Sequence, residues 1–358
     1  MPVYKDEKRG SWFASFYYID TSGARKRKKK EGFKTRKEAL EFERDFALQT
    51  ESGPKILFDD LLSLYFEDCK SRLRPTTLKA KGYILKTKIL PAFTGKRIND
   101  ITAKEIRLWQ NQLLSTEPAF TPTYLKCINN QLSAVFNFGR KYYGLHTNPV
   151  ANAGAFGRKR AEAMQFWTRE EFQHFSEAIK GNDESHIAFL LLFWTGMRSG
   201  ELLALQASDI ILKEHSIRIN KNYARLNGED LILPTKTPKS NRMVTIPQWL
   251  CDELARFLKD TGRISSKGRL FTLNKYYLNR EIHRGCQLTG LKKIRVHDLR
   301  HSHASMLIEL GFAPLLIAER LGHENVQTTL ETYSHLYPNK HKEVADRLQE
   351  MVLTTSST

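Results

Sequence analysis

The pattern of apolar positions changes along this chain, and the changes mark off its parts. Aromatic and β-branched residues gather in residues 10–33, around a turn signal at residues 20–23, and predict a small sheet. A helix is expected next, because Thr35 and Glu38 fit a capping box and apolar residues follow at helical spacing. Residues 51–54, which read Glu-Ser-Gly-Pro, are typical of a linker.

Helical periods dominate the second part, in which Thr102 and Glu105 fit another capping box. The third part begins near Trp167 and is again mainly helical, but its period becomes that of strands on both sides of Asn227-Gly228, a hairpin turn signal. We therefore expect a multidomain α+β chain. Its parts would be a three-stranded sheet with one helix, an all-α bundle, and a mainly α domain with a small antiparallel sheet. The expected domains are residues 1–53, 56–155 and 165–358.

Length and charge narrow the class of protein. A chain of 358 residues, 41% of them hydrophobic, is long enough for more than one core. The formal net charge of +18 and the pI of about 9.7 point to a polyanionic partner, and we expect nucleic acid. The longest apolar run, residues 187–194, is too short for a bilayer, so no membrane association is expected. Scattered cysteines and the lack of a secretory signal predict a reducing cytoplasm.

Basic residues cluster in two places. One is an unbroken run of six, which is either a solvated charge run or a β-ribbon laid against DNA; the aromatic residues before it favour the ribbon. The other is the helical part, whose excess of basic residues predicts a face that binds a duplex. The candidate DNA-binding residues are Arg25, Lys26, Arg27, Lys28, Lys29, Lys30, Lys79, Lys81, Arg140 and Lys141.

Cutting a phosphodiester requires a nucleophile, positive charge for the phosphate oxygens, and an acid for the leaving oxygen. The planar fork of an arginine matches two phosphate oxygens at once. His297 and Arg300 share a helix face at i, i+3 spacing, and Tyr333 supplies a hydroxyl. Taken singly, such residues are equally well explained as helix caps or half-buried aromatics. The candidates for this chemistry are Arg198, Glu201, His297, Arg300, His323 and Tyr333.

A metal site is a competing interpretation of the histidines. His297 and His301 stand at i, i+4 spacing with His303 nearby, as ligands of a metal ion would. We disfavour it because the glutamate of the H-E-x-x-H pattern is absent and no fourth ligand is evident. Neither a metal nor another cofactor is expected.

Together the motifs resemble those of the tyrosine recombinases, the phage integrase family. Their order is T-G-x-R-x-x-E-L at 195–202, H-x-L-R-H at 297–301, L-G-H at 321–323 and T-x-x-x-Y at 329–333. The order of the domains resembles that of integrases of temperate phages and conjugative transposons. Those proteins carry a small sheet for arm sites, then a helical core-binding domain, then the catalytic domain.

The resemblance implies an enzyme that integrates and excises a mobile element. Tyr333 would attack phosphorus and form a 3′-phosphotyrosyl bond, releasing a 5′ hydroxyl. Arg198 and Arg300 would clamp the phosphate, and His297 would take or share the tyrosyl proton. His323 would bind a phosphate oxygen, and Glu201 would support the arginines. Lys236 is the expected acid for the leaving oxygen, with Lys239 as its rival.

The implied partners are double-stranded DNA, at core-type and arm-type sites, and further copies of the chain in a homotetramer on DNA. An excision factor or a host DNA-bending protein is a further candidate. The implied location is the cytoplasm of a bacterial host, on the nucleoid when bound. The amphipathic residues 343–352 would pack on their own domain or on a neighbouring protomer. Two rival functions stay open, a type IB topoisomerase-like enzyme and a non-catalytic DNA-binding regulator.

Overall fold

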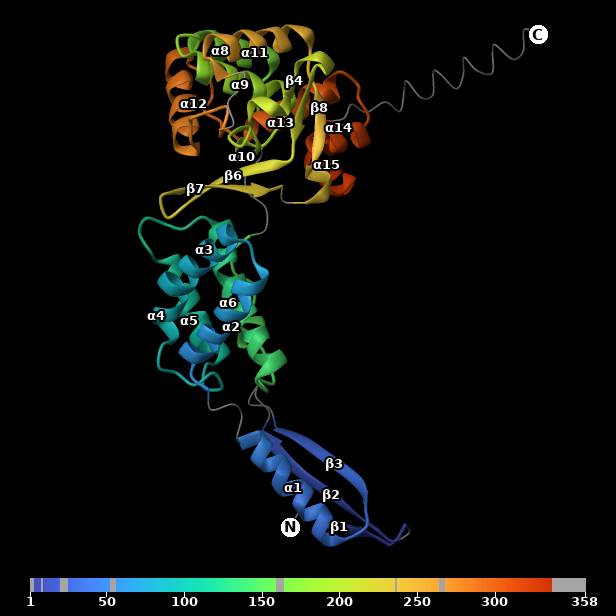
Figure 1. Ribbon diagram of the computed structural model, residues 1–358. Coiled ribbons are helices and arrows are strands. Elements are labelled where there is room, and N and C mark those ends of the chain that lie inside the picture. Colours follow the sequence, from blue (N-terminus) through green and yellow to red (C-terminus); the bar gives the residue numbers. More distant parts are fainter. Residues whose placement is uncertain are drawn as a thin grey trace, which may run out of the picture. The chain divides into compact units, whose positions relative to one another are not determined.

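The computed structural model describes residues 3–7, 9–19, 25–51, 56–158, 164–235, 237–263 and 268–336 (Figure 1). The chain divides into two compact units, Met1–Glu162 and Ala163–Thr358. Among the described residues, no helix has the length and apolar character needed to cross a bilayer. The predicted turn at 20–23, Lys236 and the amphipathic residues 343–352 lie outside the described part.

A three-stranded antiparallel sheet opens the first unit, as predicted. Its strands, in spatial order, are β1 (Val3–Asp6), β2 (Ser11–Ile19) and β3 (Arg25–Phe33). Helix α1 (Arg36–Glu51) lies along one face of the sheet and encloses a small core with it (Figure 1). The basic run therefore forms most of an edge strand, and cations on both of its faces are tolerated because all of these side chains are exposed to solvent.

The rest of the first unit is an all-α bundle. Its long helices bury one apolar face each around Phe58 and Phe136. Thr102 caps α5 in the predicted box, since its hydroxyl accepts from the Glu105 N–H and the Glu105 carboxylate accepts from the Thr102 N–H. A π-helical segment, Leu85–Ile89, joins α3 to α4. The helices are α2 (Phe58–Arg72), α3 (Pro75–Ile84), α4 (Leu90–Phe93), α5 (Ala103–Leu114), α6 (Pro122–Tyr142) and α7 (Pro149–Ala153).

The second unit is mainly helical and contains two small antiparallel sheets, where the sequence predicted one. The strand pattern is interrupted near Asn220, so one stretch becomes two strands that belong to different sheets. One sheet has the order β4-β5-β8, and the other is a β6-β7 hairpin that turns at Asn227-Gly228, as predicted. The strands are β4 (Ile210–Ile211), β5 (Ser216–Ile219), β6 (Lys221–Leu226), β7 (Glu229–Pro234) and β8 (Arg242–Thr245).

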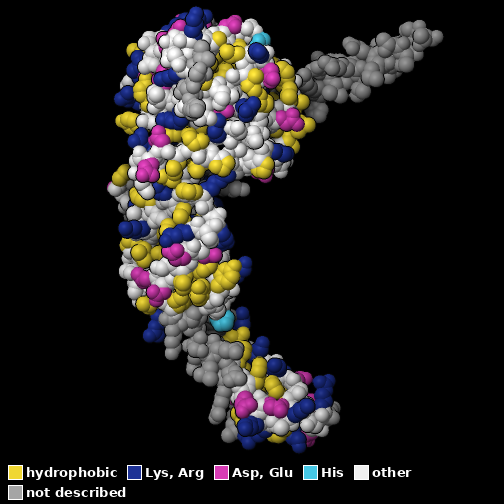
Figure 2. All heavy atoms as spheres, viewed as in Figure 1, with side chains coloured by type: hydrophobic (Ala, Val, Ile, Leu, Met, Phe, Trp, Pro, Cys, Tyr) yellow, Lys and Arg dark blue, Asp and Glu magenta, His cyan; other side chains and the backbone are white. Residues whose placement is uncertain are grey.

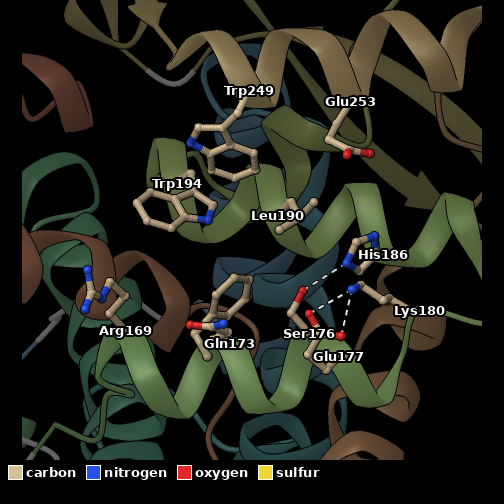
Figure 3. A pocket seen from close by; sticks show the side chains of 11 residues that line it. Arg169, Gln173, Ser176, Glu177, Lys180, His186, Leu190, Trp194, Trp249 and Glu253 are labelled. Carbon is tan, nitrogen blue, oxygen red and sulfur yellow. Dashed lines mark hydrogen bonds and ion pairs between the residues drawn. The ribbon is translucent and has the colours of Figure 1, made fainter.

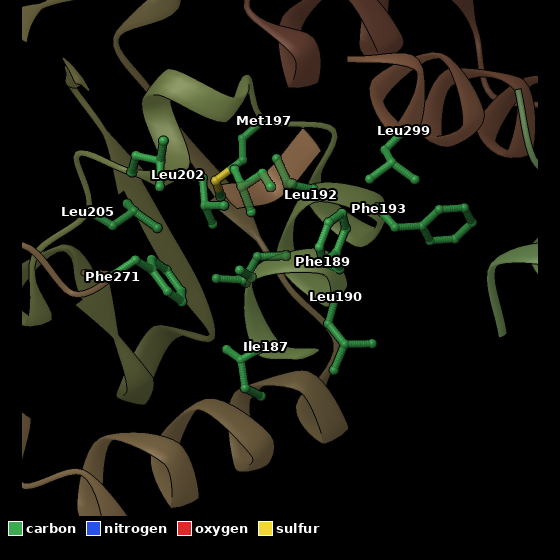
Figure 4. Packing of buried hydrophobic residues seen from close by; sticks show 14 of the residues in the cluster. Ile187, Phe189, Leu190, Leu192, Phe193, Met197, Leu202, Leu205, Phe271 and Leu299 are labelled. Carbon is green, nitrogen blue, oxygen red and sulfur yellow. The ribbon is translucent and has the colours of Figure 1, made fainter. Parts of the chain in front are cut away.

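Helix α9 is the centre of this unit. It is apolar on every side because α8, α11 and α13 all pack against it. Figure 4 shows its buried side chains meeting those of the surrounding elements, and the ring of Phe193 stacks on that of Phe172 at 3.9 Å between centroids. The helices are α8 (Arg169–Ala178), α9 (Asp183–Thr195), α10 (Ser199–Leu202), α11 (Gln248–Asp260), α12 (Lys275–Thr289), α13 (Asp298–Glu309), α14 (Pro314–Leu321) and α15 (Val326–Tyr333).

The central position of α9 gives a test of the packing. Phe189 is fully buried, so Phe189→Ala is expected to lower the free energy of unfolding by about 3–5 kcal/mol through lost burial and a residual cavity. Urea unfolding followed by tryptophan fluorescence measures this loss. As a control, Leu288→Ala at a largely exposed position of α12 should change stability by less than about 0.5 kcal/mol. Equal effects of the two substitutions would contradict the assigned core.

Candidate active site

Tyr333 is the last residue of α15 and is almost fully buried, with 1% of its surface exposed. Its hydroxyl lies 2.6 Å from Nδ1 of His301, a hydrogen-bond distance. The rings of His301 and His297, one turn apart on the same stretch of chain, meet edge to face at 5.2 Å. Burial raises the pKa of the Tyr333 hydroxyl to about 12, so the phenol is neutral at physiological pH.

Arg300 ties three helices together. Its guanidinium donates to the carbonyl of Gly196 at 2.9 Å, past the end of α9, and to the carbonyl of Leu321 at 2.6 Å, at the end of α14. Gly196 has a φ of 65°, and a Cβ there would lie 2.6 Å from the ring of His303 and 2.7 Å from Leu321. Only glycine fits this close turn, which explains the Thr-Gly pair of the motif.

Arg198 lies just before α10 and shares a buried carboxylate with a second arginine. It donates to Glu201 at 2.7 Å and more weakly to the carbonyl of Gly322 at 3.4 Å. Arg242, on β8, donates to the other oxygen of Glu201 at 3.1 Å and to the carbonyl of Arg320 at 2.8 Å. Burial alone would raise the pKa of the Glu201 carboxyl, but the charge and hydrogen bond of Arg242, together with the charge and backbone N–H of Arg198, outweigh it and lower this pKa. Glu201 therefore stays ionised between the two arginines.

His323 follows Gly322, which ends α14 in the left-handed conformation. Its Nδ1 lies 2.7 Å from the hydroxyl of Thr329 on α15, which fixes the ring and leaves Nε2 for another partner. Burial, and next the charges of Arg300 and Arg198, lower the pKa of His323 to about 3. The ring is therefore neutral at physiological pH.

The balance of charge in this cluster is positive. Glu201 pairs with Arg198 and Arg242, whereas Arg300 pairs with no carboxylate and donates to two carbonyls. Burial, followed by the charge of Arg198, lowers the pKa of Arg300 to about 9. Burial and Arg300 also lower the pKa of His297, and burial and His297 lower that of His301 to about 4. Burial is the largest cause of each of these shifts, and repulsion by a neighbouring basic group adds to it. A further cation would increase this repulsion, so the arrangement suits an anion such as a phosphodiester.

The structure brings most of the predicted catalytic residues together. Contacts and mutual electrostatic effects join Arg198, Glu201, His297, Arg300, His323 and Tyr333. Lys236 lies outside the described residues, and the exposed Lys239 lies in the turn that follows it. That turn reaches the cluster, because the hydroxyl of Ser240 contacts Arg198 at 3.4 Å.

Two contributors were missed from the sequence. The role of His301 at Tyr333 had a signal, since His301 adjoins Arg300 in H-x-L-R-H, but the sequence only suggested a metal ligand. For Arg242 the sequence carried no signal beyond its position after the turn that contains the candidate lysines. His303 faces elsewhere, since its Nε2 accepts from Arg320 at 3.0 Å. Within the described ranges, no group of three or more His, Cys, Asp or Glu side chains is arranged to hold a metal ion.

The predicted DNA-binding residues lie in the first unit, on β3, α3 and α6. Most are exposed, among them Lys79, Arg140 and Lys141. Lys81 is half-buried instead, and its ammonium donates to the hydroxyl of Tyr65 at 2.7 Å and to Gln131 at 2.6 Å. These internal bonds leave Lys81 less free to contact a phosphate than its neighbours.

A separate hollow lies between α8, α9 and α11, with a volume of about 440 Å³ (Figure 3). Trp194 and Trp249 meet edge to face on one wall. Its polar groups already have partners, because His186 contacts the Ser176 hydroxyl at 3.0 Å and Lys180 pairs with Glu177. The hollow offers none of the arginines of the cluster around Tyr333.

Comparison with known proteins finds matches in three parts of the chain. Residues 165–340 match the phage integrase family, residues 57–114 the N-terminal SAM-like domain of phage integrases, and residues 2–50 an arm DNA-binding domain. The ICEBs1 integrase of Bacillus subtilis (strain 168) is 32% identical over 339 residues, covering 89% of this chain and 91% of that protein.

Solved structures share the fold. The Tn1549 transposon integrase in complex with a circular intermediate DNA aligns with a TM-score of 0.66 at 16% identity, over 82% of this chain and 99% of that one. A lambda integrase dimer bound to a COC′ core site aligns with a TM-score of 0.59 at 20% identity, over 95% of each chain. The chain belongs to the phage integrase family, the tyrosine recombinases. It is a site-specific DNA recombinase.

The neutral histidines of the second unit make its stability depend on pH. An unfolded histidine titrates near pH 6.5, whereas burial lowers the pKa of folded His301 to about 4 and of His303 and His323 to about 3. Below about pH 6.5 the unfolded chain therefore binds protons that the native chain does not, so the free energy of unfolding decreases as the pH is lowered. The melting temperature at constant ionic strength should be lower at pH 5 than at pH 7. A constant or higher value at pH 5 would exclude these shifts.

Proposed function

We propose that this recombinase integrates and excises a mobile genetic element through a covalent bond to Tyr333. One observation carries the proposal: a buried tyrosine hydroxyl and a surplus of guanidinium groups meet in one cluster. The similarity to the ICEBs1 integrase, of which this chain covers 91%, supports a mobile element as the substrate, because that relative is named an integrase. The reaction needs no energy source, because the phosphotyrosyl bond conserves the energy of the broken phosphodiester.

In this proposal, Arg198 and Arg300 clamp the scissile phosphate. Each already uses part of its fork on carbonyls or on Glu201, which orients the fork before DNA arrives. Glu201 is the supporting residue, and His323 donates from Nε2 to a phosphate oxygen while Thr329 holds its other nitrogen. His297, beside His301, is the residue to which the family resemblance gives a share of the tyrosyl proton.

The leaving 5′ oxygen needs a proton, which a lysine of the turn after β7 would supply. Lys236 and Lys239 are the two candidates. The hydroxyls of Thr237 and Ser240 lie 3.0 Å apart, and Ser240 contacts Arg198, so the turn is anchored beside the phosphate clamp. This anchoring supports a role of the turn in catalysis and leaves both lysines within the proposal.

We propose three domains, at residues 1–53, 56–155 and 165–358. We assign DNA contacts to the first two, the sheet with its helix and the helical bundle. The bundle would bind core-type sites through Lys79, Arg140, Lys141 and neighbouring cations, with Lys81 in a lesser role. The active form would be a homotetramer on double-stranded DNA in the cytoplasm of a bacterial host, on its nucleoid. An excision factor or a host DNA-bending protein would complete the assembly.

The sheet would bind arm-type sites with the face that α1 leaves open. Register pairs Tyr17 with Arg27 and Ser15 with Lys29 on this face, and the ammonium of Lys29 lies over the ring of Phe13. Lys28 and Lys30 instead lie on the face that α1 covers, over the rings of Phe46 and Phe42 of α1 itself. Figure 2 shows basic side chains around the surface of this sheet and helix. The open face thus combines cations with aromatic rings, a surface suited to a DNA groove.

Tyr333→Phe tests the proposed nucleophile. The variant should bind attachment-site DNA as tightly as wild type, because the lost hydroxyl is not one of the groups proposed to hold the phosphate. It should form no covalent adduct. Adducts are measured by denaturing electrophoresis after reaction with a nicked suicide substrate, in the presence of a chelator. An adduct from the variant would exclude Tyr333, and loss of the wild-type adduct in chelator would support metal-assisted cleavage instead.

The open face of the sheet is tested with matched double variants. Arg25→Ala/Lys29→Ala removes two cations of this face, and Lys28→Ala/Lys30→Ala removes two from the face under α1. Each neutralised phosphate contributes about 0.9 to the salt slope of binding. The first pair should lower the slope for arm-site DNA by about 1–2, measured by fluorescence anisotropy between low and moderate salt, and the second pair by clearly less. Equal losses would contradict the assignment.

A further inference from the structure

The histidine that contacts the nucleophile is His301, and this contact has a chemical consequence. We assign to the neutral ring the tautomer with its proton on Nε2, in which Nδ1 accepts a hydrogen bond from the Tyr333 O–H. The separation of 2.6 Å leaves no room for a water between the two groups. The hydroxyl of Tyr333 therefore has an acceptor for its proton already in place.

The ring of His301 is held on two sides. It meets the ring of His297 at 5.2 Å and 83°, and the ring of Tyr333 at 5.6 Å and 60°. His301 also directly follows Arg300 in α13, so the arginine of the phosphate clamp and the contact of the nucleophile are consecutive residues of one helix. The rigid backbone of that helix fixes their relative positions.

Tyrosine needs such help. Burial raises the pKa of Tyr333 to about 12, so very little tyrosinate exists at neutral pH. A nucleophile this weakly acidic gains from a base that takes its proton during the attack. The family resemblance assigned that proton to His297, but the nitrogen at hydrogen-bond distance from the Tyr333 oxygen belongs to His301.

We propose that His301 is the catalytic base of strand cleavage, accepting the Tyr333 proton on Nδ1. As the tyrosine oxygen forms its bond to phosphorus, the O–H electron pair stays on oxygen and the proton moves to His301. The bond from phosphorus to the 5′ oxygen breaks, and the acid of the β7–β8 turn protonates that oxygen. In religation, His301 returns the proton to the tyrosine oxygen. The inference rests on Tyr333 being the nucleophile.

The surroundings of His301 explain why the proton moves only when DNA is bound. Burial and the neighbouring cations disfavour an imidazolium in the free protein. A phosphodiester anion on Arg198 and Arg300 reverses part of this effect, because it places negative charge beside the ring. The ionisable groups that act on His301 or lie against it are Arg295, His297, Asp298, Arg300, His323 and Tyr333.

The test compares His301→Ala with His301→Asn in the full chain. The amide oxygen of asparagine falls near the position of Nδ1, so it accepts the same hydrogen bond but takes no proton. If His301 is the base, both variants should form the covalent adduct about 100-fold more slowly in single-turnover reactions with a suicide substrate. Binding of the same DNA should change less than about threefold. His174→Asn, at an exposed position of α8, is the matched control and should react like wild type.

The pH profile separates a base from a positioning group. Without a base the reaction depends on tyrosinate, so the adduct rate of both variants should rise about tenfold per pH unit from pH 7 to 9, while wild type changes little. A more acidic fluorinated tyrosine at position 333 should also shrink the defect of His301→Asn. The inference is overturned if His301→Asn restores the wild-type rate, or if His301→Ala keeps it. An adduct from Tyr333→Phe would overturn the proposed nucleophile as well, which distinguishes the two failures.

Discussion

The active cluster depends on the way in which Arg300 is held. The carbonyls that accept its two bonds belong to Gly196 and Leu321, each at the C-terminal end of a helix. The last carbonyls of a helix have no partner within it, and they carry the negative end of its dipole. One buried guanidinium therefore satisfies the ends of α9 and α14 from its own place on α13. This single side chain therefore joins the motifs around residues 196, 300 and 321, although they lie far apart in the sequence.

That arrangement also costs stability. Buried charges are favourable only when they are paired, and here the carboxylate of Glu201 pairs with Arg198 and Arg242, while Arg300 has only carbonyl partners. The pKa of Arg300 is lowered to about 9 because burial and its nearest cation both oppose its charge. In the proposed reaction, the scissile phosphate would supply negative charge to this cluster, and the surplus of positive charge would favour binding of an anion.

Local signals predicted local structure well. The capping box at Thr102 and the hairpin at Asn227-Gly228 each depend on a few neighbouring residues, and both are present. The division of the strands between two sheets was not predictable, because it depends on pairing with β8 across the chain. For the same reason nothing in the sequence paired Arg242 with Glu201, 41 residues apart, or gave His301 its contact with a tyrosine 32 residues later.

The candidate catalytic residues differ in the kind of backbone that carries them, a helix for some and a turn for others. Helix α13 carries Arg300 and His301, and residue His297 immediately precedes its first turn, so their relative positions follow from regular backbone geometry. The candidate Lys239 instead lies in a short turn before β8, which Ser240 ties to the cluster. Attack on phosphorus needs the nucleophile and the phosphate aligned within a fraction of an ångström. Arg300 and His301 thus share one regular helix, and the nucleophile on α15 is positioned against that helix by its contact with His301.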